Sequence, residues 1–187
     1  YGKGGVEKDM GAYLFTFFND PTHSLFMAVS YDGYTFTAVN EGQPVISGDS
    51  IAAQRGIRDP HIYRAPNGMF YIAMTDLHVF GKQRGLRDTQ WERDDKYGWG
   101  NNRGLVLMKS KDLIHWTHTE VFVNETFPEN FGELGCAWAP QTIWDPAVEK
   151  LMVYFTIRQH PGGRTKLYYS YANEEFTALE TEPQLLF

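Results

Sequence analysis

The chain has 187 residues and a formal net charge of -6, with charges of both signs interspersed. This pattern excludes the basic stripe of a nucleic-acid-binding surface, and no apolar run approaches the roughly 20 residues that span a bilayer. The single cysteine excludes an internal disulfide. Aromatic residues make up 16% of the chain, which favours β-sheet over helix.

Six short strands are predicted from runs of aromatic and β-branched residues. They cover residues 12–18, 24–29, 69–75, 104–109, 151–157 and 165–169. Turn signals lie between them, among them Asp32-Gly33, Asn67-Gly68 and Gly162-Gly163. A helical interpretation of residues 146–155 is weak, because this run is short and rich in strand-forming residues. The sequence therefore predicts an all-β fold.

The strand pairs belong to a repeated unit. Each unit has a strand, a connection, a second strand, and then a segment that starts with Ser and carries an aromatic residue followed by Thr. These segments start at Ser30, Ser110 and Ser170. Repeated antiparallel units with connections of different length are typical of β-propeller blades. An immunoglobulin-type sandwich would show evenly spaced strands without this long period.

The length of the chain limits how much of a propeller it can form. A closed propeller has about 4 to 8 blades, and the serines that start successive units lie at positions 30, 110 and 170. We therefore expect residues 1–187 to form a partial propeller of two to three blades, completed by the remaining part of a longer parent chain or by a second chain. The alternative is a small three-unit β-domain that stands alone. The chain starts with Tyr1 and shows no signal peptide, and we expect an extracellular or periplasmic location.

Two long segments carry a resemblance to a known family. "IRDPHIYRAPNGMFYIAMTD" is followed by "LMKSKDLIHWT", and "CAWAPQTIWDPAVEKLMVYFTI" is followed by "YYSYANEEF". Together they resemble glycoside hydrolase family 43, in which a blade opens with Asp-Pro and closes with Ser-x-Asp-Leu-x-x-Trp. The next blade of that family opens with Trp-Ala-Pro-Glu. The match covers about residues 12–180.

The resemblance implies a five-bladed propeller that cleaves arabinose- or xylose-containing plant glycans with inversion. Such enzymes use an Asp general base, a second Asp that tunes pKa, and a Glu general acid. The base falls on Asp59, and Trp138 falls at the wall of the sugar pocket. Gln141 stands where the family commonly has Glu. No position here matches the second Asp or the acid, so we expect both outside this chain.

Asp59 also suits this role on chemical grounds. An inverting glycosidase needs one carboxylate to activate water and one carboxylic acid, about 6.5 to 9.5 Å apart, to protonate the leaving oxygen. Arg58 beside Asp59 would favour the ionised carboxylate. The alternative is a turn carboxylate that caps backbone amides before Pro60.

The predicted substrate-binding residues surround this position. They are Arg58, His61, Trp138 and Gln141. His61 shares a strand face with Asp59 if the strand is regular, and binds sugar hydroxyls or helps to place water or an ion; the alternative is a half-buried, hydrogen-bonded histidine. Trp138 offers a ring face to a sugar, or packs between blades. Gln141 is the weaker candidate, and a structural role for it is the alternative.

The long connection at residues 77–102 is the expected substrate-shaping or partner-contacting loop. It carries Trp91, Tyr97 and Trp99 among mixed charges, and the alternative is a solvated loop. Asp94-Asp95 points to a structural calcium ion, although two adjacent acids lack the fixed ligand spacing of a calcium loop. No cofactor is expected to be required.

Two other functions stay open. Asn19-Asp20-Pro21 and the later Arg58-Asp59-Pro60 resemble the motifs of invertase-like propellers, which hydrolyse fructosides. The first of them follows a strand here, however, and so fits a hairpin turn. The second alternative is a non-catalytic propeller that binds carbohydrate or protein. An acidic pair in the blades beyond this chain would distinguish an enzyme from such a binding protein.

Overall fold

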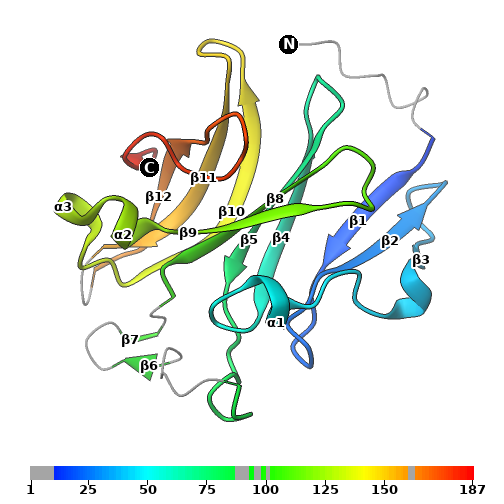
Figure 1. Ribbon diagram of the computed structural model, residues 1–187, viewed down its shortest axis with the longest axis horizontal. Coiled ribbons are helices and arrows are strands. Elements are labelled where there is room, and N and C mark those ends of the chain that lie inside the picture. The colour runs from blue at the N-terminus through cyan, green and yellow to red at the C-terminus, as the bar shows by residue number, and fades with distance from the viewer. Residues whose placement is uncertain (1–10, 87–92, 95–97, 100–101, 160–162) are drawn as a thin grey trace.

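The computed structural model describes residues 11–86, 93–94, 98–99, 102–159 and 163–187 (Figure 1). Its strands pair into antiparallel sheets and its helices are single turns, so the all-β prediction is confirmed. Within these residues, no helix is long and apolar enough to cross a membrane. The architecture is a row of three larger sheets, which we call blades 1 to 3 in chain order, with a separate two-stranded ribbon.

Blade 1 is a three-stranded sheet in the order β1-β2-β3. Its strands are β1 (Tyr13–Phe17), β2 (Phe26–Ser30) and β3 (Thr37–Ala38). A 3-10 turn at Asn40–Gly42 and the helix α1 (Gly48–Ile51) follow. The turn between β1 and β2 is closed by the bond from the His23 N–H to the Asn19 carbonyl oxygen, at 2.8 Å. This confirms that Asn19-Asp20-Pro21 begins a hairpin turn.

Blades 2 and 3 are four-stranded sheets, in the orders β4-β5-β8-β9 and β10-β11-β12-β13. Blade 2 contains β4 (Ile57–Arg64), β5 (Phe70–Asp76), β8 (Gly104–Ser110) and β9 (Thr117–Phe122). Blade 3 contains β10 (Cys136–Asp145), β11 (Lys150–Arg158), β12 (Lys166–Tyr171) and β13 (Gln184–Leu185). Between β5 and β8 lies the ribbon of β6 (Arg93–Asp94) and β7 (Gly98–Trp99), and between β9 and β10 lie α2 (Val123–Thr126) and α3 (Pro128–Phe131). All six predicted strands are present, within two residues at either end.

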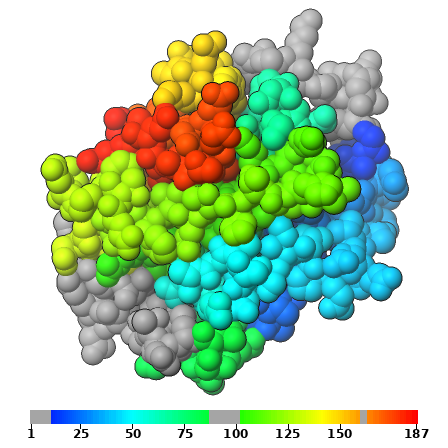
Figure 2. Space-filling model, in the orientation of Figure 1, coloured from blue at the N-terminus to red at the C-terminus, as the bar shows by residue number. Residues whose placement is uncertain are grey.

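Blade 2 is buried on both faces, which fixes the register of its strands. Side chains alternate between the faces of a strand, so Tyr71 and Ala73 of β5 pack toward blade 3 while Ile72 and Met74 pack toward blade 1. Strand β8 alternates in the same way. A shift of one residue would exchange the two cores. Figure 2 shows the C-terminal segment, in red, packed beside the α2–α3 segment, where Asn130 donates to the Glu182 carboxylate.

The repeated serine segments form matching turns in blades 1 and 2. In blade 2, the Asp112 carboxylate accepts the N–H groups of Ile114 and His115, and Ser110 hydrogen-bonds to it. Asp32 does the same in blade 1.

The third copy is built differently. Its Ser170 donates to the Thr181 carbonyl oxygen, and Asn173 closes the turn by accepting the N–H groups of Thr177 and Ala178. The reason is that Ala172 stands where the other copies have Asp. The segment that starts at Ser170 therefore does not form the same turn as the segments that start at Ser30 and Ser110.

The two aspartate turns predict loss of stability in acid. The hydrogen bonds to each carboxylate hold the pKa of Asp32 and of Asp112 well below the usual value. Since the folded-state pKa is depressed, this stabilisation is complete above the unfolded value of about 3.9 and is lost as the pH falls below it. Thermal melts from about pH 5 to about pH 2 should show a falling midpoint.

The double variant Asp32→Asn, Asp112→Asn tests the cause. It should melt at a lower temperature than the wild type at neutral pH and lose less stability on acidification. Asp49→Asn, which removes an exposed carboxylate outside these turns, is the control. Parallel midpoint curves for the double variant and the wild type would contradict the assignment.

Candidate active site

The inner strands of blades 2 and 3 lie against each other. Strand β4 is the edge strand of blade 2 and β10 is the edge strand of blade 3, and the two are in contact. The contact includes the Thr142 N–H, which donates to His61 Nδ1 at 3.3 Å. Residues at the start of β4 and of β10 are therefore brought together although they are far apart in sequence.

Both inner strands carry a bulge that contains a proline. In β4 the register with β5 shifts between Arg58 and His61, so Asp59 and Pro60 form the irregularity. In β10 the register with β11 shifts between Trp138 and Gln141, around Ala139 and Pro140. A bulge inserts an extra residue and redirects a side chain. By these registers, Asp59 of blade 2 corresponds to Ala139 of blade 3, and His61 to Gln141.

Asp59 is exposed. Its backbone φ of 52° lies in the left-handed region, which residues other than Gly seldom adopt. Its Oδ2 accepts a hydrogen bond from the Thr75 hydroxyl at 2.9 Å. The Thr75 oxygen in turn accepts the Ala139 N–H at 2.8 Å. The carboxylate is therefore open to solvent on one side and held by blade 3, through Thr75, on the other.

Arg58 points away from this carboxylate and into blade 1. Its Nη1 lies 2.9 Å from Asp20 Oδ1 and 3.2 Å from His23 Nε2. Its guanidinium carbon lies 4.5 Å from the centre of the Phe18 ring, a distance at which cation–π attraction is effective. These contacts attach β4 to the turn of blade 1. The substrate-binding role predicted for Arg58 stays a prediction.

His61 is half-buried, and burial lowers its pKa. Because Nδ1 accepts the Thr142 N–H, the proton of the neutral ring is assigned to Nε2, which can donate to a ligand. The expectation that His61 shares a face with Asp59 assumed a regular strand, and the bulge removes that regularity.

The predicted residues of β10 lie at its bulge. Gln141 is exposed, and its Oε1 accepts the Tyr154 hydroxyl at 2.5 Å, which leaves its amide N–H groups for a ligand. Trp138 is half-buried and pairs with Thr156.

The other sequence predictions fall on residues with little or no description. Trp91, Tyr97 and Asp95 lie outside the described residues, and only the backbone is described for Asp94 and Trp99. In the described part of the chain, no group of three or more His, Cys, Asp or Glu is arranged to hold a metal ion. The calcium prediction and the role of the long connection therefore stay predictions.

A buried histidine pair behind Arg58 was missed from the sequence. The rings of His23 and His78 stack with centroids 4.0 Å apart, and His23 is fully buried. Since Nε2 of His23 faces N–H donors from Arg58 and Val79, it must be an acceptor, and the ring is neutral. Burial, then the neighbouring His78 and Arg58, lower the pKa of His23 to about 4. No local motif marks this pair, because the packing of the β1–β2 turn of blade 1 against the end of β5 in blade 2 brings the two rings together.

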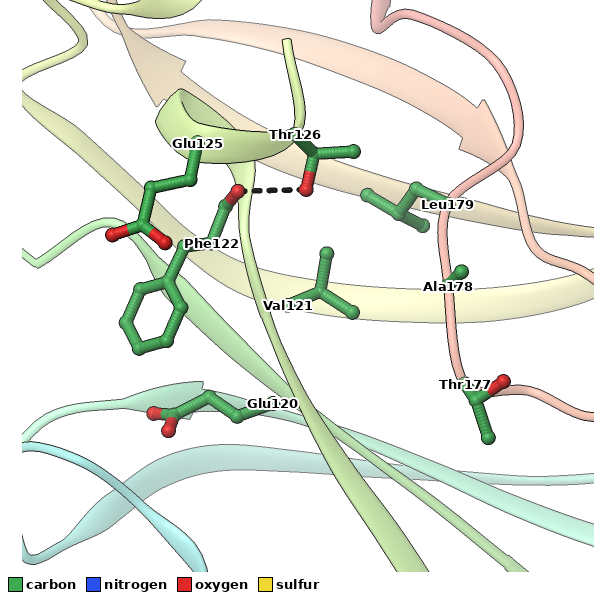
Figure 3. Close-up of a pocket in the computed structure, with 8 residues that line it drawn as sticks. All are labelled: Glu120, Val121, Phe122, Glu125, Thr126, Thr177, Ala178 and Leu179. Carbon is green, nitrogen blue, oxygen red and sulfur yellow. Dashed lines mark hydrogen bonds between the residues drawn. The ribbon is translucent and has the colours of Figure 1, made fainter. Parts of the chain in front are cut away.

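The clearest cavity lies elsewhere. It has a volume of about 290 Å³ and opens between β9, α2 and the turn after β12 (Figure 3). Its lining residues are Glu120, Val121, Phe122, Glu125, Thr126, Thr177, Ala178 and Leu179. Strand β9 is the outer strand of blade 2, at the opposite edge of the sheet from Asp59 on β4. The cavity is therefore not the Asp59 site.

The arrangement of the sheets is that of propeller glycoside hydrolases. An α-L-arabinofuranosidase from Lactobacillus brevis aligns with a TM-score of 0.61 at 14% identity, over 94% of this chain and 50% of that chain. An exo-1,5-α-L-arabinanase from a bovine ruminal metagenomic library aligns with a TM-score of 0.56 at 13% identity, over 95% and 51% of the two chains. At these identities the likeness concerns the fold alone, and it confirms the propeller prediction.

Sequence comparison gives the family. The profile of a family described as a probable glycosyl hydrolase domain, related to glycosyl hydrolase 43, matches residues 8–187, and the chain belongs to that family. An α-L-arabinofuranosidase of Bifidobacterium longum subsp. longum is 29% identical over 133 residues. That alignment covers 68% of this chain and 11% of the relative. The chain thus spans about half the length of the solved structures and a small part of the curated relative.

The histidine pair predicts a second pH dependence of stability, separate from that of the aspartate turns. Unfolded His23 takes up a proton near pH 6.5, whereas folded His23 does so at about pH 4. The contribution of neutral His23 to the free energy of unfolding should therefore be fully present above about pH 6.5. The free energy of unfolding should fall by up to about 3 kcal/mol on acidification to about pH 4. Urea unfolding at a series of pH values measures this slope.

His23→Asn is the informative variant, because Asn tolerates the positive φ of 48° found at this position. It should lose most of the slope between about pH 6.5 and about pH 4. His118→Asn, at an exposed histidine of β9, is the matched control and should keep the slope. An unchanged slope in His23→Asn would overturn the assignment.

Proposed function

We propose that the protein is a glycoside hydrolase that cleaves arabinose- or xylose-containing glycans with inversion, with Asp59 as the general base. The observation that carries the proposal is the placement of the Asp59 carboxylate on the bulge of an inner strand. Its Oδ2 is held by Thr75, while its Oδ1 has no hydrogen-bond partner among the residues that the structure describes. A general base needs an acceptor atom within hydrogen-bond reach of the proton that it takes, and Oδ1 is available for that contact.

The chemistry follows from this geometry. Oδ1 of Asp59 accepts a proton from a water molecule, and the water oxygen attacks the anomeric carbon from the face opposite the leaving group. The acid that protonates the leaving oxygen must lie across the substrate, about 6.5 to 9.5 Å away. We assign that acid and the pKa-tuning carboxylate to the remaining blades of the parent chain. We propose those remaining blades as the partner of blades 1 to 3. An extracellular or periplasmic location belongs to the same proposal.

Neighbouring side chains have the donors that a sugar requires. Neutral His61 offers Nε2–H, and Gln141 offers its amide N–H groups. Trp138 stands at the same bulge as Gln141 and supplies an aromatic surface. The similarity to an α-L-arabinofuranosidase and to an exo-1,5-α-L-arabinanase supports arabinose as the sugar.

The first test is Asp59→Asn in the protein with its full parent chain. The substitution keeps the shape of the side chain and removes the base, so kcat on nitrophenyl pentosides should fall by on the order of 10²- to 10⁴-fold. Asp145→Asn is the matched control, because Asp145 also precedes a proline and ends the inner strand of blade 3. That control should keep its kcat. Wild-type kcat in Asp59→Asn would sink the base assignment.

The second test concerns stereochemistry. If Asp59 activates water directly, the sugar first released has the opposite anomeric configuration to the substrate. Proton NMR of the first turnovers, before mutarotation, distinguishes the two anomers. Release of the same anomer as the substrate would show a covalent intermediate and contradict inversion, while hydrolysis itself would still stand.

A further inference from the structure

Three groups on three different strands form one continuous chain of hydrogen bonds. The Ala139 N–H at the bulge of β10 donates to the Thr75 oxygen at 2.8 Å, and the Thr75 hydroxyl donates to Asp59 Oδ2 at 2.9 Å. Thr75 lies near the end of β5 and is fully buried. It pairs with Arg58, the residue just before the bulge of β4. One buried hydroxyl therefore contacts the bulges of two successive blades.

The direction of these hydrogen bonds is fixed by the groups themselves. A backbone N–H can only donate, so the Thr75 oxygen must accept from Ala139. The hydroxyl has a single proton, and an ionised carboxylate can only accept. The Thr75 proton is therefore committed to Oδ2 of Asp59. A valine at this place, which has the same shape without the hydroxyl, would leave both the amide and Oδ2 without this partner.

We propose that Thr75 is a positioning residue for the general base, which turns the Asp59 carboxylate so that Oδ1 is the oxygen left to activate water. This inference rests on the proposed function. Thr75 does not touch the substrate or the water itself; it acts through Asp59. Thr75 also makes the orientation of the base depend on the position of blade 3, because the Thr75 oxygen accepts the Ala139 N–H of that blade.

The backbone at both bulges gives an independent reason for such a tie. Asp59 has a φ of 52° and Ala139 a φ of 50°, and neither is a glycine. Residues in this region are strained and keep their conformation only when the surrounding structure fixes it. Thr75 bonds to the side chain of one and to the backbone of the other. The hydroxyl therefore fixes the two strained positions relative to each other.

Blade 3 offers a natural comparison. Thr156 on β11 pairs with Trp138, just before the bulge of β10, as Thr75 pairs with Arg58 before the bulge of β4. The bulge residue of blade 3 is Ala139, which has no carboxylate. Thr156 therefore has the same residue type and register position as Thr75 without a base to orient. Thr156→Val is the matched control for Thr75→Val.

The kinetic test uses the protein with its full parent chain and separates kcat from KM. Thr75→Val should lower kcat by roughly 10- to 100-fold, the scale of a misplaced catalytic group, with little change in KM. Thr75→Ser restores the hydroxyl and should recover most of the wild-type kcat. Thr156→Val should keep it. Equal kcat values in Thr75→Val and the wild type, or a loss that Thr75→Ser does not recover, would overturn the proposal.

A second measurement does not depend on activity. In protein labelled with ¹⁵N-alanine, the amide of Ala139 reports on the bond to Thr75. With Thr75 intact, Asp59→Asn should move this amide resonance, because the substitution changes the acceptor at the far end of the chain of hydrogen bonds. Asp145→Asn should leave it in place. In Thr75→Ser the response to Asp59→Asn should persist, and in Thr75→Val it should be much smaller.

The two measurements separate the two proposals. If the wild type hydrolyses no pentoside while the Ala139 resonance follows Asp59, the proposed function fails and the link through Thr75 stands. If hydrolysis occurs and the resonance ignores Asp59, the positioning role of Thr75 is wrong. If Thr75→Val does not fold, the test keeps two arms: an Ala139 resonance that ignores Asp59→Asn, or a response that is lost in Thr75→Ser, would each overturn the proposal.

Discussion

The extra residue in β4 turns Asp59 out of the regular ladder of blade 2, and the candidate site depends on this bulge. In a regular strand the carboxylate would point to one of the two sheet faces, both of which are occupied by packed cores in this blade. At the bulge it is exposed at the edge of the sheet, beside the inner strand of blade 3. A charged group gains access to water there without leaving a rigid strand.

The bulge is held in place by the packing around it. Blade 2 is covered by blade 1 on one face and blade 3 on the other, so the alternation along β5 cannot shift by one residue without exchanging the two cores. That fixed register places Thr75 opposite the start of the bulge. The orientation of one exposed carboxylate therefore follows from two hydrophobic cores.

The sequence predicted six of the strands to within two residues, because aromatic and β-branched runs between turn residues are local signals. It also pointed to Asp59, through the Asp-Pro motif before a strand. It could not find Thr75 or the pair of His23 and His78, since their contacts depend on strand register and blade packing. The alignment of Ser170 with the other two serines did not reveal the different turn that follows it. Ser170 matches the other two serines, but Ala172 lacks the carboxylate that closes the turn in blades 1 and 2.

Neighbouring residues of β4 are attached to opposite neighbours. Arg58 reaches Asp20 and His23 of blade 1, and Asp59 is bonded through Thr75 to blade 3. Arg58 therefore attaches the start of the bulge to blade 1, and Thr75 attaches the Asp59 carboxylate to blade 3. His23 can accept from Arg58 only while its ring is neutral, which its lowered pKa ensures near neutral pH. Protonation of His23 would place two cations side by side, so the attachment of β4 to blade 1 through Arg58 depends on a neutral His23.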